Sequence, residues 1–185
     1  MEAHEEKKIG DYILKIFPDE PHDSPDDWGN DDVFVVFDHR DFSVERDGFK
    51  ARDIWEYMMD NPNKVLYDGY HVIQCYAYIH SGVVLSVGDH CFPDARWDVS
   101  STGFWLVKKQ KGTWTREQAL KSAEGLCTVW NQYLCGDVWG YEVCKITKCE
   151  LNHEHETHID SCWGYYGIES CRQEGTQTLE YHSKQ

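Results

Sequence analysis

The 185-residue sequence has no long apolar run. No stretch approaches the roughly 18 residues that a membrane-spanning helix needs, and the charged start, Met1–Lys8, has no apolar segment of the secretory type. We therefore expect a cytoplasmic protein. In that compartment the eight cysteines are expected to remain thiols or to bind metal, because disulfides rarely persist there.

Phosphate-binding glycine loops are also absent. The chain has neither GxxxxGK[ST] nor a GxGxxG that opens a helix after a strand, so nothing in it indicates a nucleotide-binding enzyme. We expect no catalytic residues and no enzymatic activity. The sequence also has no internal repeat and no low-complexity linker.

Positive charge is scarce, with 18 Lys and Arg against 33 Asp and Glu and a formal net charge of −15. The one basic cluster, Lys108–Lys111 with Arg116 and Lys121, lies in the section 61–122, which has seven bases and five acids. Its net charge of +2 is too small to predict a nucleic-acid-binding surface. Direct binding of nucleic acid and binding to a membrane surface are therefore not expected.

Acidic residues are concentrated near the N-terminus. The first sixty residues hold 18 acids and 7 bases, a net charge of −11. The densest segment, Asp19–Asp32, has seven acids, no base, and Pro and Gly residues that break a helix. We expect an exposed acidic loop that attracts basic surfaces, such as the channel of a DNA- or RNA-handling protein. The alternative is that the acids only keep the protein soluble.

This loop supplies the predicted partner-binding residues. Its carboxylates would mimic the phosphates of DNA, and its tryptophan would act as an aromatic anchor. The candidates are Asp19, Glu20, Asp23, Asp26, Asp27, Trp28, Asp31 and Asp32.

A second group of residues has the chemistry of zinc ligands. Thiolate and imidazole are the groups that zinc prefers in tetrahedral sites. The weak candidates are Cys144, Cys149, His153, His155, His158 and Cys162, with Cys171 further along the chain. No C-x2-C pair is present and the histidines lie in a Glu-rich segment, so exposed loop histidines and packed thiols are the favoured interpretation. We expect no cofactor.

Hydrophobic periodicity predicts several strands and two helices. Short β-branched or aromatic runs predict strands at 71–80, 83–87, 103–108 and 138–146, and another pair at 11–17 and 33–37 that would form a hairpin presenting the acidic loop. One helix is expected at 50–60, with Ile54, Trp55, Met58 and Met59 on one face. The longest runs from Thr115 to Leu134, opening with a capping box formed by Thr115 and Gln118 and ending at Gly136.

These elements predict an α+β fold in which an antiparallel sheet packs against one long helix. The content of eight Trp, eleven Tyr and seven Phe argues for a filled core and against disorder. We expect a single layered domain over 1–185, with an acidic N-terminal portion (1–61), a core (62–167) and a polar tail (168–185).

Two motifs carry a resemblance to known proteins. NQYLCGDVWGY (131–141) and DSCWGYYG (160–167) resemble a family of small proteins encoded by phages and other mobile elements. The segments Tyr76–Gly88, Arg96–Asp98 and Ser101–Phe104 also fit its pattern, so that the resemblance covers residues 70–167. Cys135 and the Cys/His cluster depart from the family, and the acidic portion 1–61 lies outside the similar region.

The resemblance implies a context rather than a reaction, since the family is largely without an assigned activity. Mobile elements gain from proteins that disable host nucleases, and several of these inhibitors are strongly acidic. The leading hypothesis is an anti-defence inhibitor, an anti-CRISPR protein, that competes with DNA for a type II CRISPR effector, with a restriction enzyme as the next target. The alternatives are a zinc-stabilised accessory module or enzyme, and a non-catalytic interaction scaffold.

Overall fold

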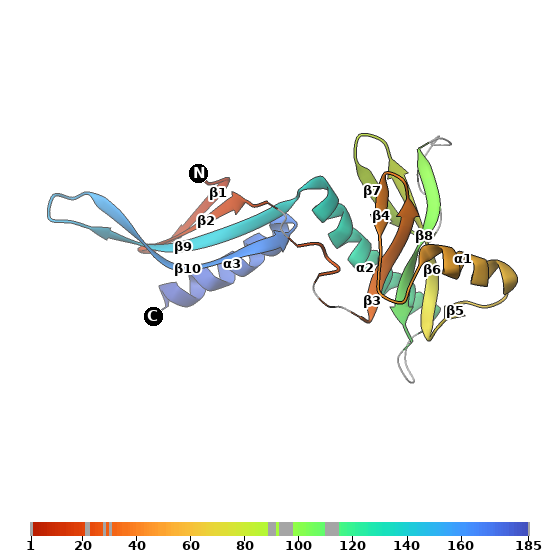
Figure 1. Cartoon of the computed structure of the whole chain (residues 1–185). Helices are drawn as coiled ribbons and strands as arrows, with labels where there is room; N and C mark the ends of the chain where they lie inside the picture. The colour runs from red at the N-terminus through yellow and green to blue at the C-terminus, as the bar shows by residue number, and fades with distance from the viewer. Residues whose placement is uncertain are drawn as a thin grey trace. The chain divides into compact units, whose positions relative to one another are not determined.

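The computed structural model describes residues 2–20, 23–27, 29, 31–88, 92, 98–109 and 115–184. It has an α+β architecture, with antiparallel sheets and three helices in these ranges (Figure 1). The chain divides into two compact units: unit 1 comprises Met1–His22 and Gly136–Gln185, and unit 2 comprises Asp23–Cys135. None of the described helices has the length and apolar character needed to cross a membrane.

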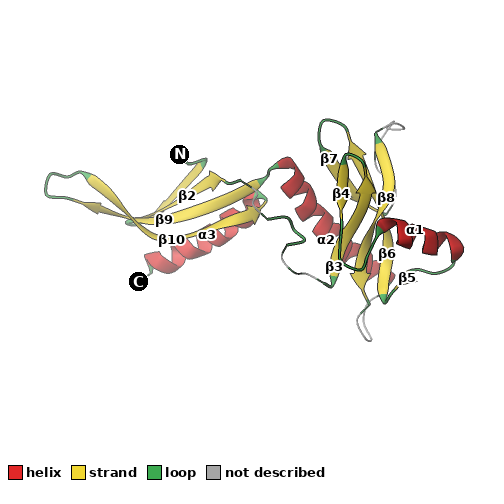
Figure 2. Ribbon diagram, viewed as in Figure 1, coloured by secondary structure: helices red, strands yellow, loops and turns green. Residues whose placement is uncertain are grey.

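Unit 1 is a four-stranded antiparallel sheet with one helix on one face (Figure 2). Its strand order is β1-β2-β9-β10. The elements are β1 (Glu5–Ile9), β2 (Tyr12–Pro18), β9 (Val138–Lys148), β10 (Glu154–Tyr166) and α3 (Ile168–Ser183). The core between sheet and helix contains Leu14, Tyr141 and Leu179. A Cβ at Gly175 would lie 2.8 Å from Leu14 Cδ1, so the missing side chain lets α3 approach the sheet closely.

Unit 2 is a six-stranded antiparallel sheet with helices on both faces (Figures 1 and 2). The strand order is β4-β3-β8-β6-β5, and β7 also pairs with β6. The elements are β3 (Val33–His39), β4 (Phe42–Val44), α1 (Ala51–Asp60), β5 (Leu66–Tyr67), β6 (Tyr70–Ile79), β7 (Val83–Val87), β8 (Val99–Lys108) and α2 (Arg116–Cys135).

The central strand β3 shows why this sheet needs two helices. Val35 and Phe37 lie in the core that α2 covers, whereas Phe34 and Val36 lie in the core that α1 covers. Successive side chains of a strand point to opposite faces, so a continuous apolar run produces two cores. The unbroken run Val33–Phe37 is the sequence signature of this arrangement.

Helix α2 begins as predicted. Gln118 N donates to Thr115 Oγ1 at 3.3 Å, and Thr115 N donates to Gln118 Oε1 at 2.8 Å. This reciprocal pair is a capping box, which satisfies two backbone donors at the helix start. The helix is followed by Gly136, whose φ of 72° is the left-handed conformation that glycine adopts without strain.

The predicted pairing of one sheet with one helix is wrong, because the strands belong to two sheets. The predicted hairpin across the acidic loop is also wrong: β2 pairs with β1 and β9, and β3 pairs with β4 and β8. Strand pairing depends on the competition between all strands of the molecule, which local patterns do not record.

The composition-based boundaries do not coincide with the two units. The boundary between 61 and 62 falls between α1 and β5 of unit 2, and the predicted polar tail 168–185 contains the 16-residue helix α3. The sequence of that helix is mostly polar because only a narrow stripe, Cys171, Gly175 and Leu179, is buried. The single domain over 1–185 stays a prediction.

Candidate functional site

The structure divides the predicted acidic loop between the two units. Asp19 and Glu20 belong to unit 1, and the acids from Asp23 to Asp32 belong to unit 2. Trp28, together with Arg96, Trp97 and Lys111, lies outside the described residues. The seven acids of the predicted site therefore fall into two separate groups, one in each unit.

Asp19 supports the structure of unit 1. Its N–H donates to the carbonyl of Val138 at 2.8 Å, which extends the pairing of β2 with β9. Its carboxylate accepts from Glu20 N at 2.8 Å and from Gly164 N at 3.0 Å. Gly164 lies where the register of β10 shifts between Cys162 and Tyr165, so Asp19 stabilises an irregular part of that strand. Glu20 is exposed.

In unit 2, the turn at Ser24 fixes the first acids. Asp27 Oδ2 accepts from Ser24 N at 2.8 Å and from Ser24 Oγ at 2.9 Å, and Asp27 N donates back to the Ser24 carbonyl at 3.0 Å. These hydrogen bonds favour the charged form and lower the pKa of the Asp27 carboxyl. Asp27 remains exposed, as does Asp23.

Arg46 connects this turn with the rest of the segment. Its Nη1 donates to the carbonyl of Asp26 at 3.5 Å, and its Nη2 forms an ion pair with the carboxylate of Asp31. The guanidinium carbon lies 5.0 Å from the centre of the Phe34 ring, a cation–π contact with the core of unit 2. Arg46 therefore holds Asp26 and Asp31 against the folded sheet.

Asp26 differs from its acidic neighbours. Its Oδ2 is buried and accepts no hydrogen bond from the residues that the structure describes. Burial raises the pKa of its carboxyl to about 6, against the opposing effect of the Arg46 charge. Asp26 is thus mostly charged at neutral pH, with one carboxylate oxygen buried, and takes up a proton near pH 6.

The end of the segment is attached to the sheet. Tyr70 Oη donates to the Asp31 carbonyl at 3.2 Å, and Lys108 N donates to the Asp32 carbonyl at 2.7 Å. Lys108 Nζ also lies 3.3 Å from the carboxylate of Asp32. Four exposed carboxylates thus lie on a stretch of backbone with several fixed points. We call these four, Asp23, Asp27, Asp31 and Asp32, the acidic segment.

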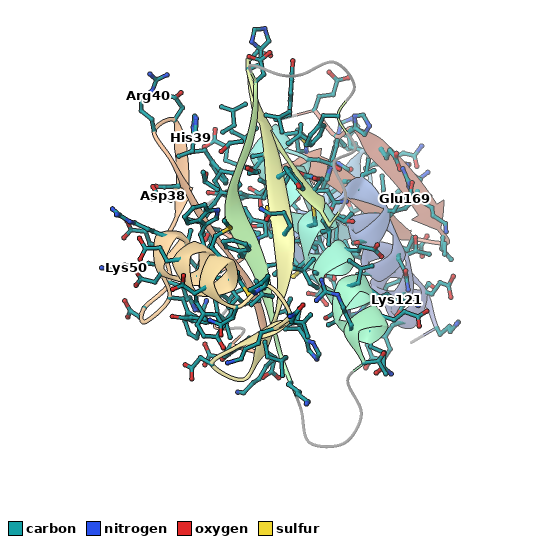
Figure 3. The ribbon with its side chains drawn as sticks, turned by 90° about the vertical axis from the view of Figure 1, so that its right-hand side faces the viewer. Asp38, His39, Arg40, Lys50, Lys121 and Glu169 are labelled. Carbon is teal, nitrogen blue, oxygen red and sulfur yellow. The ribbon has the colours of Figure 1, made fainter. Side chains whose placement is uncertain are left out.

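A groove beside helix α1 was not predicted. It consists of a cavity of about 790 Å³ and a smaller apolar one of about 230 Å³, which share Asp38, Ala51 and Arg52. Figure 3 shows Asp38 on the hairpin of β3 and β4 and Lys50 at the start of α1. We call this combined feature the α1 groove. Its charged lining residues are Asp38, Glu45, Asp47, Asp53, Glu56, Arg46, Lys50 and Arg52.

Helix α1 supplies the apolar part of the groove. The predicted apolar face, Ile54, Trp55, Met58 and Met59, is only partly correct: Ile54 is buried, but Trp55 is 51% and Met59 62% exposed. Ala51 and Ile54 cover the sheet instead. The adjacent apolar pairs in the sequence were the available signal, since one buried stripe does not accommodate both members of each pair.

The zinc candidates lie along the hairpin of β9 and β10. His158 is opposite Cys144, whereas His155 is opposite Thr147 and Cys162 is opposite Tyr141. Cys149 is at the turn, where its N–H donates to the carbonyl of His153 at 3.0 Å. Within the described ranges, no three His, Cys, Asp or Glu residues are placed to share a metal ion. Strand pairing spreads these side chains along a ribbon instead of gathering them.

Three comparisons with known proteins gave no match, whether to family models, to curated proteins or to solved structures. The resemblance to small phage and mobile-element proteins therefore stays a prediction.

Proposed function

We propose that this chain is a non-catalytic binding protein that occupies a basic, nucleic-acid-binding surface of a partner protein. The proposed partner is a host defence nuclease, with a guide-loaded type II CRISPR effector tested first and a restriction enzyme next. Binding would exclude DNA from the nuclease because carboxylates would take the positions of phosphates.

The observation that supports this proposal is the attachment of the acidic segment by Arg46. Duplex DNA carries one charge per about 1.7 Å of its axis, so a competitor needs closely spaced carboxylates. The contacts of Arg46 with Asp26 and Asp31, and of Lys108 with Asp32, restrain the backbone before any partner binds. Less conformational entropy is then lost on association.

The charge of the whole chain supports the same partner class. Unit 1 has 15 acids and 7 bases, and unit 2 has 18 acids and 11 bases. Both units are therefore negative, and their field accelerates encounter with a basic surface and opposes encounter with nucleic acid.

The test is size-exclusion chromatography of the protein with the guide-loaded effector, with and without target DNA, at low and high salt. We expect co-elution that target DNA prevents and that high salt weakens, since contacts between exposed charges are screened beyond roughly 8 Å at physiological ionic strength. No co-elution under any condition would remove this effector as the partner.

A neutral variant locates the interaction. The four residues of the acidic segment are changed to asparagine, because a lysine at Asp31 would face Arg46 and disturb the loop. The matched control changes four exposed acids of unit 1 to glutamine: Glu150, Glu154, Glu174 and Glu180. We expect the first variant to lose co-elution and the second to keep it. Equal loss in both would show that net charge alone matters.

A further inference from the structure

The α1 groove combines an apolar pocket with an excess of carboxylates. We propose that it docks a short segment of the partner protein that carries a leucine-like or aromatic side chain close to an arginine or lysine. This inference rests on the proposed function and specifies the chemistry of the partner in a second contact on unit 2.

The apolar part of the groove suits one large side chain. Its cavity of about 230 Å³ is bounded by Asp38, Ala51, Arg52, Trp55 and Thr102. Thr102 Oγ1 donates to the carbonyl of Asp38, so the hydroxyl of this wall is already hydrogen-bonded. The indole of Trp55 is left as the main apolar surface. Half-exposed tryptophans beside a pocket are typical anchors of protein interfaces.

Met59 extends this apolar surface by one helical turn. It lies four residues after Trp55, which places the two side chains on the same side of α1. Both are more exposed than half. Methionine adapts its shape to different partners, so the pair accepts aliphatic as well as aromatic side chains.

The larger cavity favours a cation. Five carboxylates and three cationic side chains line its volume of about 790 Å³. Two of the cations are engaged, since Arg46 pairs with Asp31 and Arg52 pairs with Glu56 at 3.0 Å. Across the part of the chain that the structure describes, Glu45 and Asp47 form no ion pair or hydrogen bond. An arginine or lysine of the partner would complement these two carboxylates.

The two requirements are met by one short segment. The cavities share Asp38, Ala51 and Arg52, so they adjoin each other along the start of α1. A chain that places an apolar side chain against Trp55 therefore brings its neighbouring residues next to the carboxylates. The same excess of negative charge disfavours acidic peptides and nucleic acid.

The test uses a fluorescently labelled hexapeptide of alternating arginine and leucine, with an arginine–serine hexapeptide as its control. Binding is measured by fluorescence anisotropy at low salt. We expect the arginine–leucine peptide to bind at least about tenfold more tightly than the arginine–serine peptide, because only the former fills the pocket at Trp55. Equal affinities, or no binding, would overturn the proposal.

Variants then locate the peptide. Trp55→Ala and the pair Glu45→Lys with Asp47→Lys should each weaken binding by about tenfold or more. The matched control is Glu150→Lys with Glu174→Lys, which makes the same charge change at exposed positions of unit 1. Equal weakening in this control would overturn the proposal.

Arg52→Ala should raise the affinity for the peptide, whereas the variants above should lower it. It removes an exposed cation from the wall shared by both cavities, so peptide affinity should rise by about two- to threefold. A fall in affinity would contradict the assigned role of the groove. The expected rise cannot come from a loss of folding, because an unfolded variant would bind the peptide less tightly.

Failure of the peptide-binding test can be distinguished from failure of the size-exclusion test with the nuclease. The variant with four asparagines in the acidic segment should bind the arginine–leucine peptide within about threefold of the unmodified protein, because the groove residues are unchanged. In the unmodified protein, peptide binding without co-elution would reject the nuclease as partner and leave the groove in place. Retained nuclease binding without peptide binding would reject the groove.

Discussion

At the scale of single residues, the acids of this chain have different roles despite their similar appearance in the sequence. Asp19 stabilises an irregular strand and Asp27 closes a turn, while Asp31 and Asp32 pair with Arg46 and Lys108. These partners lie elsewhere in the chain for all but Asp27. Composition therefore predicts the negative charge of the segment, but not which carboxylates are engaged.

Asp26→Asn tests the energetic consequence of partial burial. The pKa of Asp26 is raised from 3.8 to about 6, so the folded state holds its proton more tightly than the unfolded state. Its contribution to stability is therefore full below pH about 4 and is lost as the pH rises to about 6. Asparagine carries no charge, so the variant should be more stable at pH 8 by about 1 kcal/mol, discounted for partial exposure.

Urea denaturation of both proteins at pH 4 and pH 8 measures this effect. The difference between variant and unmodified protein should be near zero at pH 4. Asp47→Asn is the matched control, because Asp47 is exposed, and it should show no such pH dependence. A loss of stability in Asp26→Asn at pH 8 would contradict the assigned burial of the charge.

At the scale of elements, local signals predicted two of the three described helices, α1 and α2, and six of the ten described strands. The capping box of α2 is confirmed by both of its hydrogen bonds, and the predicted helix at 50–60 corresponds to α1. The exposed side of α1 could not be assigned in advance. Helical periodicity identifies Ile54, Trp55, Met58 and Met59 as neighbours, but the packing against Phe34 and Leu106 decides which of them is buried.

Thr115→Ala tests the capping box. The variant removes the acceptor of the Gln118 N–H and should lower the free energy of unfolding by about 1 kcal/mol. Gln118→Ala removes the other half of the pair. Because both residues form one unit, the double variant should lose less than the sum of the single variants. Strict additivity in chemical denaturation would show that the box does not act as a unit.

At the scale of the whole molecule, both units are negative, and each has its own core. The cores are apolar and aromatic, so burial of apolar surface contributes to their stability. The alternative of a zinc-stabilised module is tested by the zinc content and the thermal stability of the purified protein. Protein purified without chelators should contain less than about a tenth of an equivalent of zinc, and its thermal midpoint should not change with EDTA.

Elemental analysis and thermal denaturation provide the two readings. One equivalent of bound zinc, together with a lower thermal midpoint in EDTA, would support the zinc-stabilised module. The Cys144→Ser variant would then identify the site, since Cys144 is the candidate ligand directly opposite His158.

The sequence by itself determined the α+β character, the acidity and the positions of helices α1 and α2 and of strands β2, β3 and β6 to β9. These properties depend on composition and on patterns within short stretches, such as the run Val33–Phe37 and the spacing in α2. Only the tertiary structure decided that β2 and β3 join different sheets, that Arg46 holds the acidic segment, and that Trp55 borders a groove. Each of these depends on contacts between residues distant along the chain, which are selected by competition among all strands and side chains.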